Sequence, residues 1–392
     1  MKKLTIFLLI FFIIIPCIFA QRGEFAVADR GFEIGIMKTS FGLSNDFLTT
    51  SDIFQETAII DLDGLKKGFN MNLSLGVTPV YMSFNRKSNW GFGFSLGLDA
   101  TGIIGLSGSM ITFGEANDER SEISGAVFVE TQFSTFFHVS KIRVNLSPSV
   151  FFPIMVLNPI AGDSGISYTK STADGETILY IDYNFSVYTA FPLDSEYVNF
   201  SDIITKPGFD INLGVVYPLF KGLDLGLDIY NLPLVPAQMH NYMKISGRIG
   251  SEAPINIFDD GLDGFFNIDE TETGENQIGI IRPFKLMAWA EWQLFGNRLL
   301  TIIPTLGFSL SDFYNRKFSL ECGASARLDL ANIFIATVGI GYYDRYWKNS
   351  IDLAFNLRLV EFNFGFDMRS SSFIQSWRAA GFGVNFGLKF GW

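Results

Sequence analysis

The chain ends in the stretch GFGVNFGLKFGW (Gly381–Trp392), in which apolar residues alternate with small or polar ones. Every second residue counted back from Trp392 is apolar, whereas the intervening positions hold glycines, Asn385 and Lys389. Side chains that alternate with a period of two lie on opposite faces of a β-strand. The last segment is therefore predicted to be a strand with one strongly apolar face.

The same alternation recurs along the chain, for example over 90–100, 209–217, 223–229, 351–357 and 362–368. Most of these segments reach the roughly 9–11 residues that cross a bilayer as a tilted strand. Sixteen strands are predicted, near 31–44, 68–84, 90–112, 123–139, 142–152, 176–189, 208–217, 222–230, 240–248, 283–295, 298–310, 317–328, 332–343, 350–358, 360–368 and 380–392.

The composition excludes several classes of protein. The chain has 392 residues, of which 42 are Phe and only 18% are charged, and its mean hydropathy is +0.26. Disordered chains have low hydrophobicity and high charge, so disorder is excluded. The net charge of -11 argues against binding to nucleic acid, because phosphate repels such a surface. Two cysteines cannot build a disulfide scaffold.

Residues 1–20 are predicted to be a secretory signal peptide, which leaves one domain over 21–392. Two lysines precede an apolar stretch over 4–15, and small Ala20 precedes the expected cut. The alternatives are a transmembrane anchor, for which the stretch is short of about 20 residues, and a lipoprotein at Cys17, which follows a poor lipobox. Loss of Lys2 and Lys3 would change the net charge from -11 to -13.

Short and long connections separate the predicted strands. The short ones lie at 140–141, 296–297, 329–332 and 359–360, and the long ones at 45–67, 113–122, 153–175, 249–282 and 369–379. Outer-membrane barrels show this asymmetry, and a sheet in hydrocarbon must close on itself. A secreted β-sandwich or propeller would also alternate, but its polar face would be rich in Lys and Glu.

The fold class that follows is all-β: a transmembrane antiparallel up-and-down β-barrel of about 14–16 strands. The hairpin at 218–222 is tight, but counting strands back from the C-terminus places it at the barrel end that carries the long loops. Either a strand is missing in 153–175 or one strand prediction is wrong. Aromatic residues near strand ends are predicted to form interfacial girdles, Trp289 and Tyr343 among them.

The C-terminal strand resembles the terminal β-signal of bacterial outer-membrane proteins. The resemblance implies that Phe386, Leu388, Phe390 and Trp392 are recognised by the barrel-assembly machinery. It also implies a location in the outer membrane of a diderm bacterium, with outer-membrane lipids as partners.

A second resemblance is architectural. The chain length, the strand number and the segments GFDINLG (208–214) and LDLGLD (223–228) are similar to FadL-type long-chain fatty acid transporters. This resemblance implies carriage of hydrophobic compounds past an N-terminal plug with an Asn-Pro-Ala motif. The chain departs from that pattern, because the near match Asn158-Pro159-Ile160 lies mid-chain in a predicted loop.

No enzyme or cofactor site is predicted. The two histidines, His138 and His240, have no neighbouring catalytic constellation and are both expected near the periplasmic end. Phosphate loops, dinucleotide motifs and metal-spaced Cys/His sets are absent from the sequence. The segment 249–281 has eight acidic residues and no Lys or Arg, and is expected to be a solvated loop, with calcium binding or host contact as the alternative.

The predicted function is passive passage of small solutes, hydrophobic ones among them, and no motif identifies the solute. The alternative is a structural or adhesive surface barrel with a closed lumen. Charged positions on the polar faces are the lumen candidates: Asp99, Glu130, Arg143, Asp182, Asp210, Asp228, Lys285, Glu291, Glu321, Arg327, Arg358 and Asp367.

Overall fold

The computed structural model describes residues 30–45, 69–86, 89–106, 122–157, 165–173, 176–192, 206–251, 268–311, 318–378 and 380–392. The predicted signal peptide, the motif at 158–160 and most of the predicted loops lie outside these ranges. No helix of the described residues is long and apolar enough to cross a membrane.

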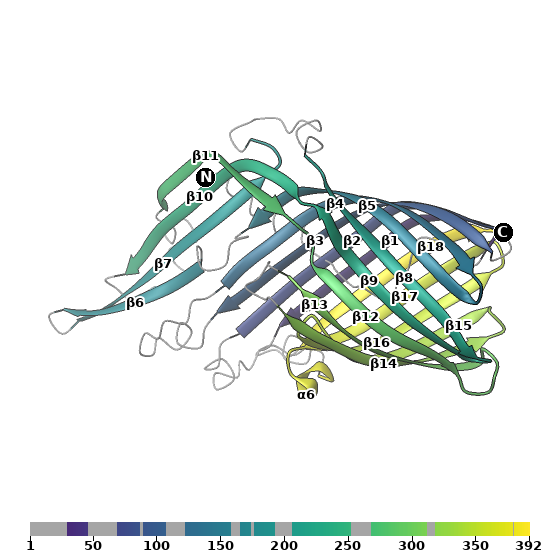
Figure 1. Ribbon diagram of the computed structural model, residues 1–392. Coiled ribbons are helices and arrows are strands. Elements are labelled where there is room, and N and C mark those ends of the chain that lie inside the picture. The colour runs from purple at the N-terminus through teal and green to yellow at the C-terminus, as the bar shows by residue number, and fades with distance from the viewer. Residues whose placement is uncertain are drawn as a thin grey trace.

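Within the described residues, fourteen strands close into one antiparallel ring (Figure 1). In order around the ring they are β1 (Phe32–Asn45), β2 (Phe69–Arg86), β3 (Trp90–Leu106), β4 (Glu122–Val139), β5 (Ile142–Leu157), β8 (Gly208–Phe220), β9 (Leu223–Val235), β12 (Phe284–Gln293), β13 (Leu300–Leu310), β14 (Ser319–Leu330), β15 (Phe334–Tyr343), β16 (Tyr346–Leu357), β17 (Val360–Ser370) and β18 (Gly381–Gly391).

The last strand closes the ring against the first. β18 pairs with β1 from Gly391 opposite Glu33 to Phe382 opposite Leu43. The backbones of Phe32 and Trp392 exchange hydrogen bonds of 3.1 and 3.0 Å at the end of this seam. Closure leaves no open sheet edge in the wall, which is the condition for a sheet in hydrocarbon.

Four further strands extend from the ring as a branch of the same sheet, which we call the outer sheet. Its order is β6 (Gly165–Ala173), β7 (Glu176–Thr189), β10 (Ala237–Ser251) and β11 (Ile268–Ile280). Figure 1 shows this sheet projecting from the end of the barrel opposite the C-terminus. It joins the wall where the end of β5 pairs with the end of β7.

This outer sheet corrects two sequence predictions. The segments 176–189 and 240–248, predicted as wall strands, belong to β7 and β10 outside the ring. Parts of the predicted loops 153–175 and 249–282 are the strands β6 and β11. With these strands outside the ring, the tight hairpin between β8 and β9 lies at the same barrel end as the other short turns.

The two ends of the barrel differ. The turn rim carries Trp392 and the short turns 140–141, 221–222, 294–299, 331–333 and 358–359. The loop rim at the other end carries the outer sheet, the short helix α6 (Phe373–Ser376) and the connections that leave β1, β3 and β13. One short turn, 344–345, also lies at the loop rim.

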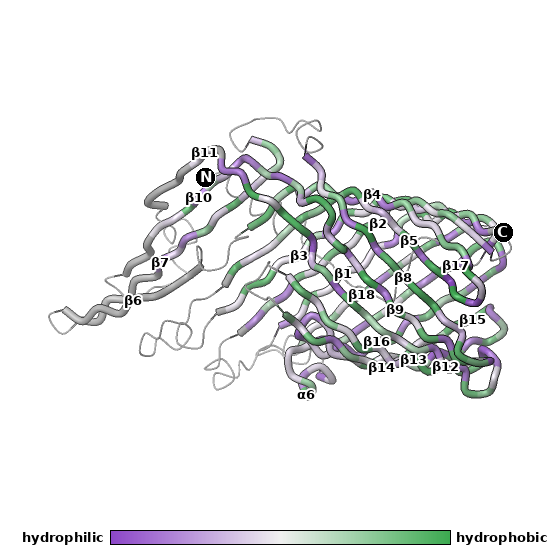
Figure 2. The backbone as a smooth tube through the Cα atoms, in the orientation of Figure 1, coloured by the Kyte–Doolittle hydropathy of each residue, from purple (hydrophilic) through white to green (hydrophobic). Residues whose placement is uncertain are grey.

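The predicted alternation is confirmed in the wall. Large apolar side chains on the outward face are exposed along many strands, including Phe92, Phe133, Leu306 and Phe364. Figure 2 shows apolar and polar residues alternating along the wall strands. A monomer in water rarely exposes so continuous an apolar surface.

Candidate functional site in the barrel lumen

The inward face of the wall carries charged side chains that are buried. Asp210, Asp228 and Glu321 are each no more than 2% exposed. A buried charge is costly unless it is paired and hydrogen-bonded. These buried charges are therefore expected to lie in ion-paired networks.

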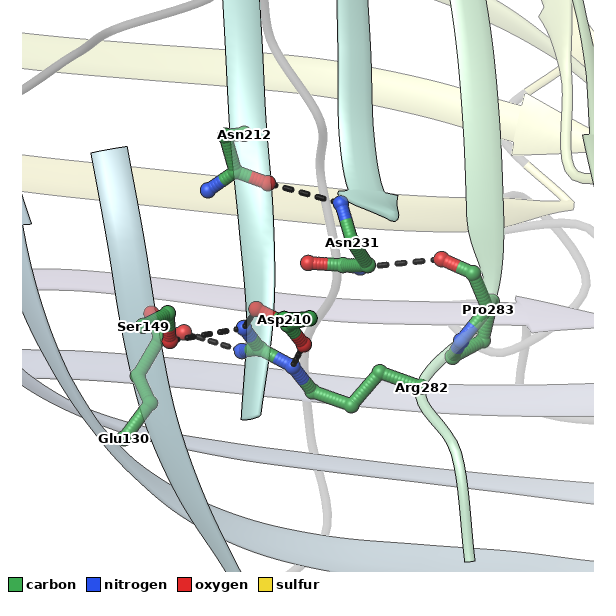
Figure 3. Close-up of polar contacts among 7 residues, drawn as sticks. All are labelled: Glu130, Ser149, Asp210, Asn212, Asn231, Arg282 and Pro283. Atoms are coloured by element: carbon green, nitrogen blue, oxygen red, sulfur yellow. Dashed lines mark hydrogen bonds and ion pairs between the residues drawn. The ribbon is translucent and has the colours of Figure 1, made fainter. Parts of the chain in front are cut away.

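The most connected network centres on Arg282, which no sequence prediction included (Figure 3). Its guanidinium donates two hydrogen bonds of 2.7 Å to the two carboxylate oxygens of Asp210. It also donates to Ser149 Oγ at 2.9 Å and to the carboxylate of Glu130. These four residues, which we call the Arg282 cluster, link β4, β5 and β8 to the connection that follows β11.

That connection, Ile281–Pro283, is fixed by a bulge in β9. Tyr230 and Asn231 together oppose Asn212 of β8, and Asn231 has a positive φ of 51°. The backbone N–H of Asn231 donates to Asn212 Oδ1 at 2.7 Å, and its side-chain amide donates to the Pro283 carbonyl at 2.9 Å. Figure 3 shows Arg282 reaching from this segment to the wall strands. The bulge thereby positions Arg282.

An apolar cluster lies next to the Arg282 cluster on its loop-rim side. Phe151 shares the inward face of β5 with Ser149, and its ring lies 5.1 Å from Arg282 Cζ. We call this set the mouth cluster: Ala126, Phe128, Phe151, Val156, Tyr188, Ala237, Met239 and Ile280, all buried. It combines the inner faces of β4 and β5 with β7, β10 and β11.

The mouth cluster shows how the outer sheet meets the barrel. Ala237 begins β10, and it faces Ile280 at the end of β11. Both belong to the same buried cluster as Phe128 and Phe151, whose positions in β4 and β5 face inward. The base of the β10–β11 hairpin therefore folds over the inner wall at the loop rim and covers part of the lumen mouth.

Other lumen candidates are paired further along the barrel. Lys285 binds Glu321 at 3.2 Å and Asp344 at 2.9 Å, and Glu291 pairs with Arg327. Asp367 is held between Arg369 and Lys348, the latter at 3.4 Å.

The remaining candidates lie on the inner wall or outside it. Asp99 lies opposite Phe128 and interacts electrostatically with Glu130 and Arg282. Arg143 donates to Asn145 at 3.2 Å and lies over the Phe136 ring. Two predictions need correction. Asp182 belongs to β7 outside the ring, and Arg358 is exposed in the turn 358–359, because β16 ends before it.

Large aromatic side chains lie flat against the inner wall over glycines. The indole of Trp289 covers Gly226, where an added Cβ would fall 2.0 Å from its ring, and its Nε1–H donates to Asp228 Oδ2 at 2.6 Å. Tyr343 lies over Gly323 in the same way and bonds to Thr305 at 2.7 Å. The prediction of Trp289 and Tyr343 as interfacial girdle residues is therefore wrong.

The two histidines lie at opposite ends of the barrel. His138 lies at the turn rim, with Nδ1 3.1 Å from the Asn89 carbonyl. His240 was predicted at the same end, but it lies on β10 beside Lys206, at the loop rim. Phe386, Leu388 and Phe390 lie on the outward side of β18, and Trp392 follows the end of this strand. In the described part of the chain, no group of His, Cys, Asp or Glu could hold a metal ion.

These observations define the class: a closed, antiparallel, up-and-down β-barrel with an ionic lumen and an apolar mouth. No protein-family profile and no curated protein matches the chain. Solved structures do. The toluene transporter TodX of Pseudomonas putida is similar with a TM-score of 0.52 at 8% identity, over 93% of this chain and 90% of that one.

The toluene transporter TbuX of Ralstonia pickettii gives a TM-score of 0.50 at 9% identity, over 94% and 91% of the two chains. At such identity the likeness establishes the fold alone. The architectural resemblance to FadL-type proteins is thus confirmed as a resemblance of fold.

Proposed function

We propose that the chain is an integral outer-membrane barrel that conducts small hydrophobic solutes. The observation that carries this proposal is the mouth cluster, an apolar site at the loop rim that lies next to the buried ion pairs of the Arg282 cluster. The outward apolar face supports placement in a membrane. The described fold, shared with two proteins named as toluene transporters, supports the choice of solute class.

The base of the β10–β11 hairpin covers part of the lumen mouth in the described structure. An apolar solute that inserts between Phe151 and Ile280 within the mouth cluster would break no polar interaction between them, because both side chains are apolar. Movement of the β10–β11 base would then carry Arg282 away from Asp210 and Glu130. Passage is proposed to require this displacement of the Arg282 cluster.

The competing function is a structural or adhesive surface barrel. The projecting sheet β6–β7–β10–β11 and the buried ion networks favour it, because both would serve a barrel that stays closed. The two functions predict different permeabilities and can be separated directly.

The test uses intact diderm cells that express the full chain, compared with cells that carry an empty vector. Uptake of the apolar dye N-phenylnaphthylamine is followed by fluorescence, and uptake of a polar β-lactam of similar size is followed by its periplasmic hydrolysis. The proposal predicts faster dye uptake with unchanged β-lactam uptake. No change in either solute would support the closed barrel, and an equal rise in both would indicate an unselective pore.

A further inference from the structure

The turn rim carries a repeated pattern of cations. Each of four turns contributes one exposed basic side chain: Lys141, Lys221, Arg298 and Arg358. We call these residues the basic ring. Within the described residues, none of the four forms an ion pair with another side chain. Exposed cations in four turns of one rim are available to a partner outside the chain.

Large apolar side chains stand beside every one of these cations. Val139, Phe220, Phe295 and Leu359 lie within three residues of the basic ring in sequence, and each is more than half exposed. Trp392, at the same rim, is 75% exposed. Long basic side chains next to an apolar band extend their charged ends to the membrane interface. The turn rim therefore has the chemistry of a lipid headgroup boundary.

The sign of the charge at this rim is opposite to that of the whole chain. The net charge of the whole chain is -11, whereas the basic ring places four positive charges at the turn rim. At the turn rim, the half-buried acid Asp329 already accepts a hydrogen bond from the Asn332 N–H at 2.7 Å. The four exposed cations of the basic ring favour an anionic partner at this end of an acidic protein.

Arg358 of the basic ring lies at a pocket in the turn rim. A pocket of about 440 Å³ is lined by Arg30, Arg358, Leu359 and Trp392. Arg30 is already engaged, with Asn356 and with Glu361 at 3.7 Å. The guanidinium of Arg358 is left to receive a phosphate, while Leu359 and Trp392 offer an apolar surface to the glycerol and the first methylenes of an acyl chain.

We propose that the turn rim binds the phosphate headgroups of anionic phospholipids through the basic ring. This inference rests on the proposed membrane location and is independent of solute passage. The match between basic side chains, adjacent apolar side chains and a lipid-facing wall favours phospholipid over an acidic soluble protein, which would not need the apolar residues. The ring would also fix which end of the barrel faces the phospholipid leaflet.

The test measures binding of phosphatidylglycerol and of phosphatidylcholine to the detergent-purified full chain by native mass spectrometry. The variant Lys221→Gln/Arg298→Gln removes two neighbouring cations of the ring. Its matched control is Arg345→Gln/Arg378→Gln, which removes two exposed cations at the loop rim. One Lys or Arg at an anionic surface contributes about 1 kcal/mol, roughly a fivefold change in affinity.

The expected result is a loss of about 25-fold in phosphatidylglycerol affinity for the turn-rim variant, from two such cations, with the control unchanged. Phosphatidylcholine binding should be weaker in the wild type and insensitive to both variants. Equal affinities in all three proteins, or equal losses in both variants, would overturn the inference. If the first variant does not fold, Lys141→Gln/Arg358→Gln tests the same prediction. A wild-type chain that fails to insert into vesicles would instead contradict the membrane location.

Discussion

Arg282 and Asp210 form a bidentate ion pair inside the barrel, with two hydrogen bonds of 2.7 Å. Asp210 belongs to wall strand β8, whereas Arg282 belongs to the segment by which the outer sheet returns to the wall. The pair therefore joins the segment that follows β11, next to the hairpin base that covers part of the mouth, to the wall strand β8. Because this fork geometry is specific to Arg and a carboxylate, neither partner is replaceable by a simple charge.

Replacement of Arg282 by Gln should open the mouth and destabilise the barrel. Asp210 and Glu130 would lose their buried cation, and removal of one partner from a buried pair costs about 3–5 kcal/mol. Dye uptake should rise and the unfolding temperature should fall. Arg327→Gln, which breaks the separate pair with Glu291, is the control and should leave dye uptake unchanged. A folded Arg282→Gln protein with wild-type uptake would show that the pair does not close the mouth.

The mouth cluster makes a prediction about stability. Phe151 is buried against the base of the β10–β11 hairpin, so Phe151→Ala should leave a cavity and cost about 3–5 kcal/mol. Phe133 on neighbouring β4 is exposed on the outer face, and Phe133→Ala should cost much less. Urea titration of both refolded variants measures the difference. Equal costs would mean that the hairpin base does not pack on the inner wall.

The contact between Trp289 and Gly226 can be tested by adding one methyl group. A Cβ at Gly226 would fall 2.0 Å from the indole, so Gly226→Ala should displace Trp289 from Asp228 and shift the tryptophan emission spectrum. Gly274 in β11 has open space around its Cβ position, so Gly274→Ala is the matched control. Identical spectra for the two variants would contradict the flat placement of Trp289 on the wall.

Local pattern predicts the wall strands because the lipid-facing side of each strand must be apolar at every second residue. The segments 90–100 and 381–392 show this pattern clearly, and both are wall strands. The pattern fails for β11, whose sequence IDETETGENQIGI has no such alternation. β11 is a strand because it pairs with β10, and such pairing cannot be read from its own composition.

The lumen site was predictable only in part. Period-two counting placed Glu130, Asp210 and Asp228 on the inner face, and the structure pairs two of them with partners outside any local pattern. Arg282 contacts Glu130 across 152 positions and Asp210 across 72, a relationship that only closure of the ring creates. The residue type of Trp289 suggested a place in an interfacial girdle. Trp289 lies an even number of positions from Lys285 and Glu291, so it shares their face of β12, and this spacing correctly places it in the lumen.

The most direct test of the account compares two adjacent residues of β17 that lie on opposite faces. Phe364 is exposed on the outer face near the middle of the strand, and Asn363 faces inward. An Arg at the bilayer midplane on the lipid side costs about 2–4 kcal/mol, whereas lumen positions tolerate charge. Folding of Phe364→Arg and Asn363→Arg into phospholipid vesicles should be compared by urea titration and heat-modifiable gel mobility. Phe364→Arg should lose stability by that amount, and Asn363→Arg should have a small effect. Equal stability of the two variants, or wild-type stability of Phe364→Arg, would contradict a barrel whose apolar face meets lipid.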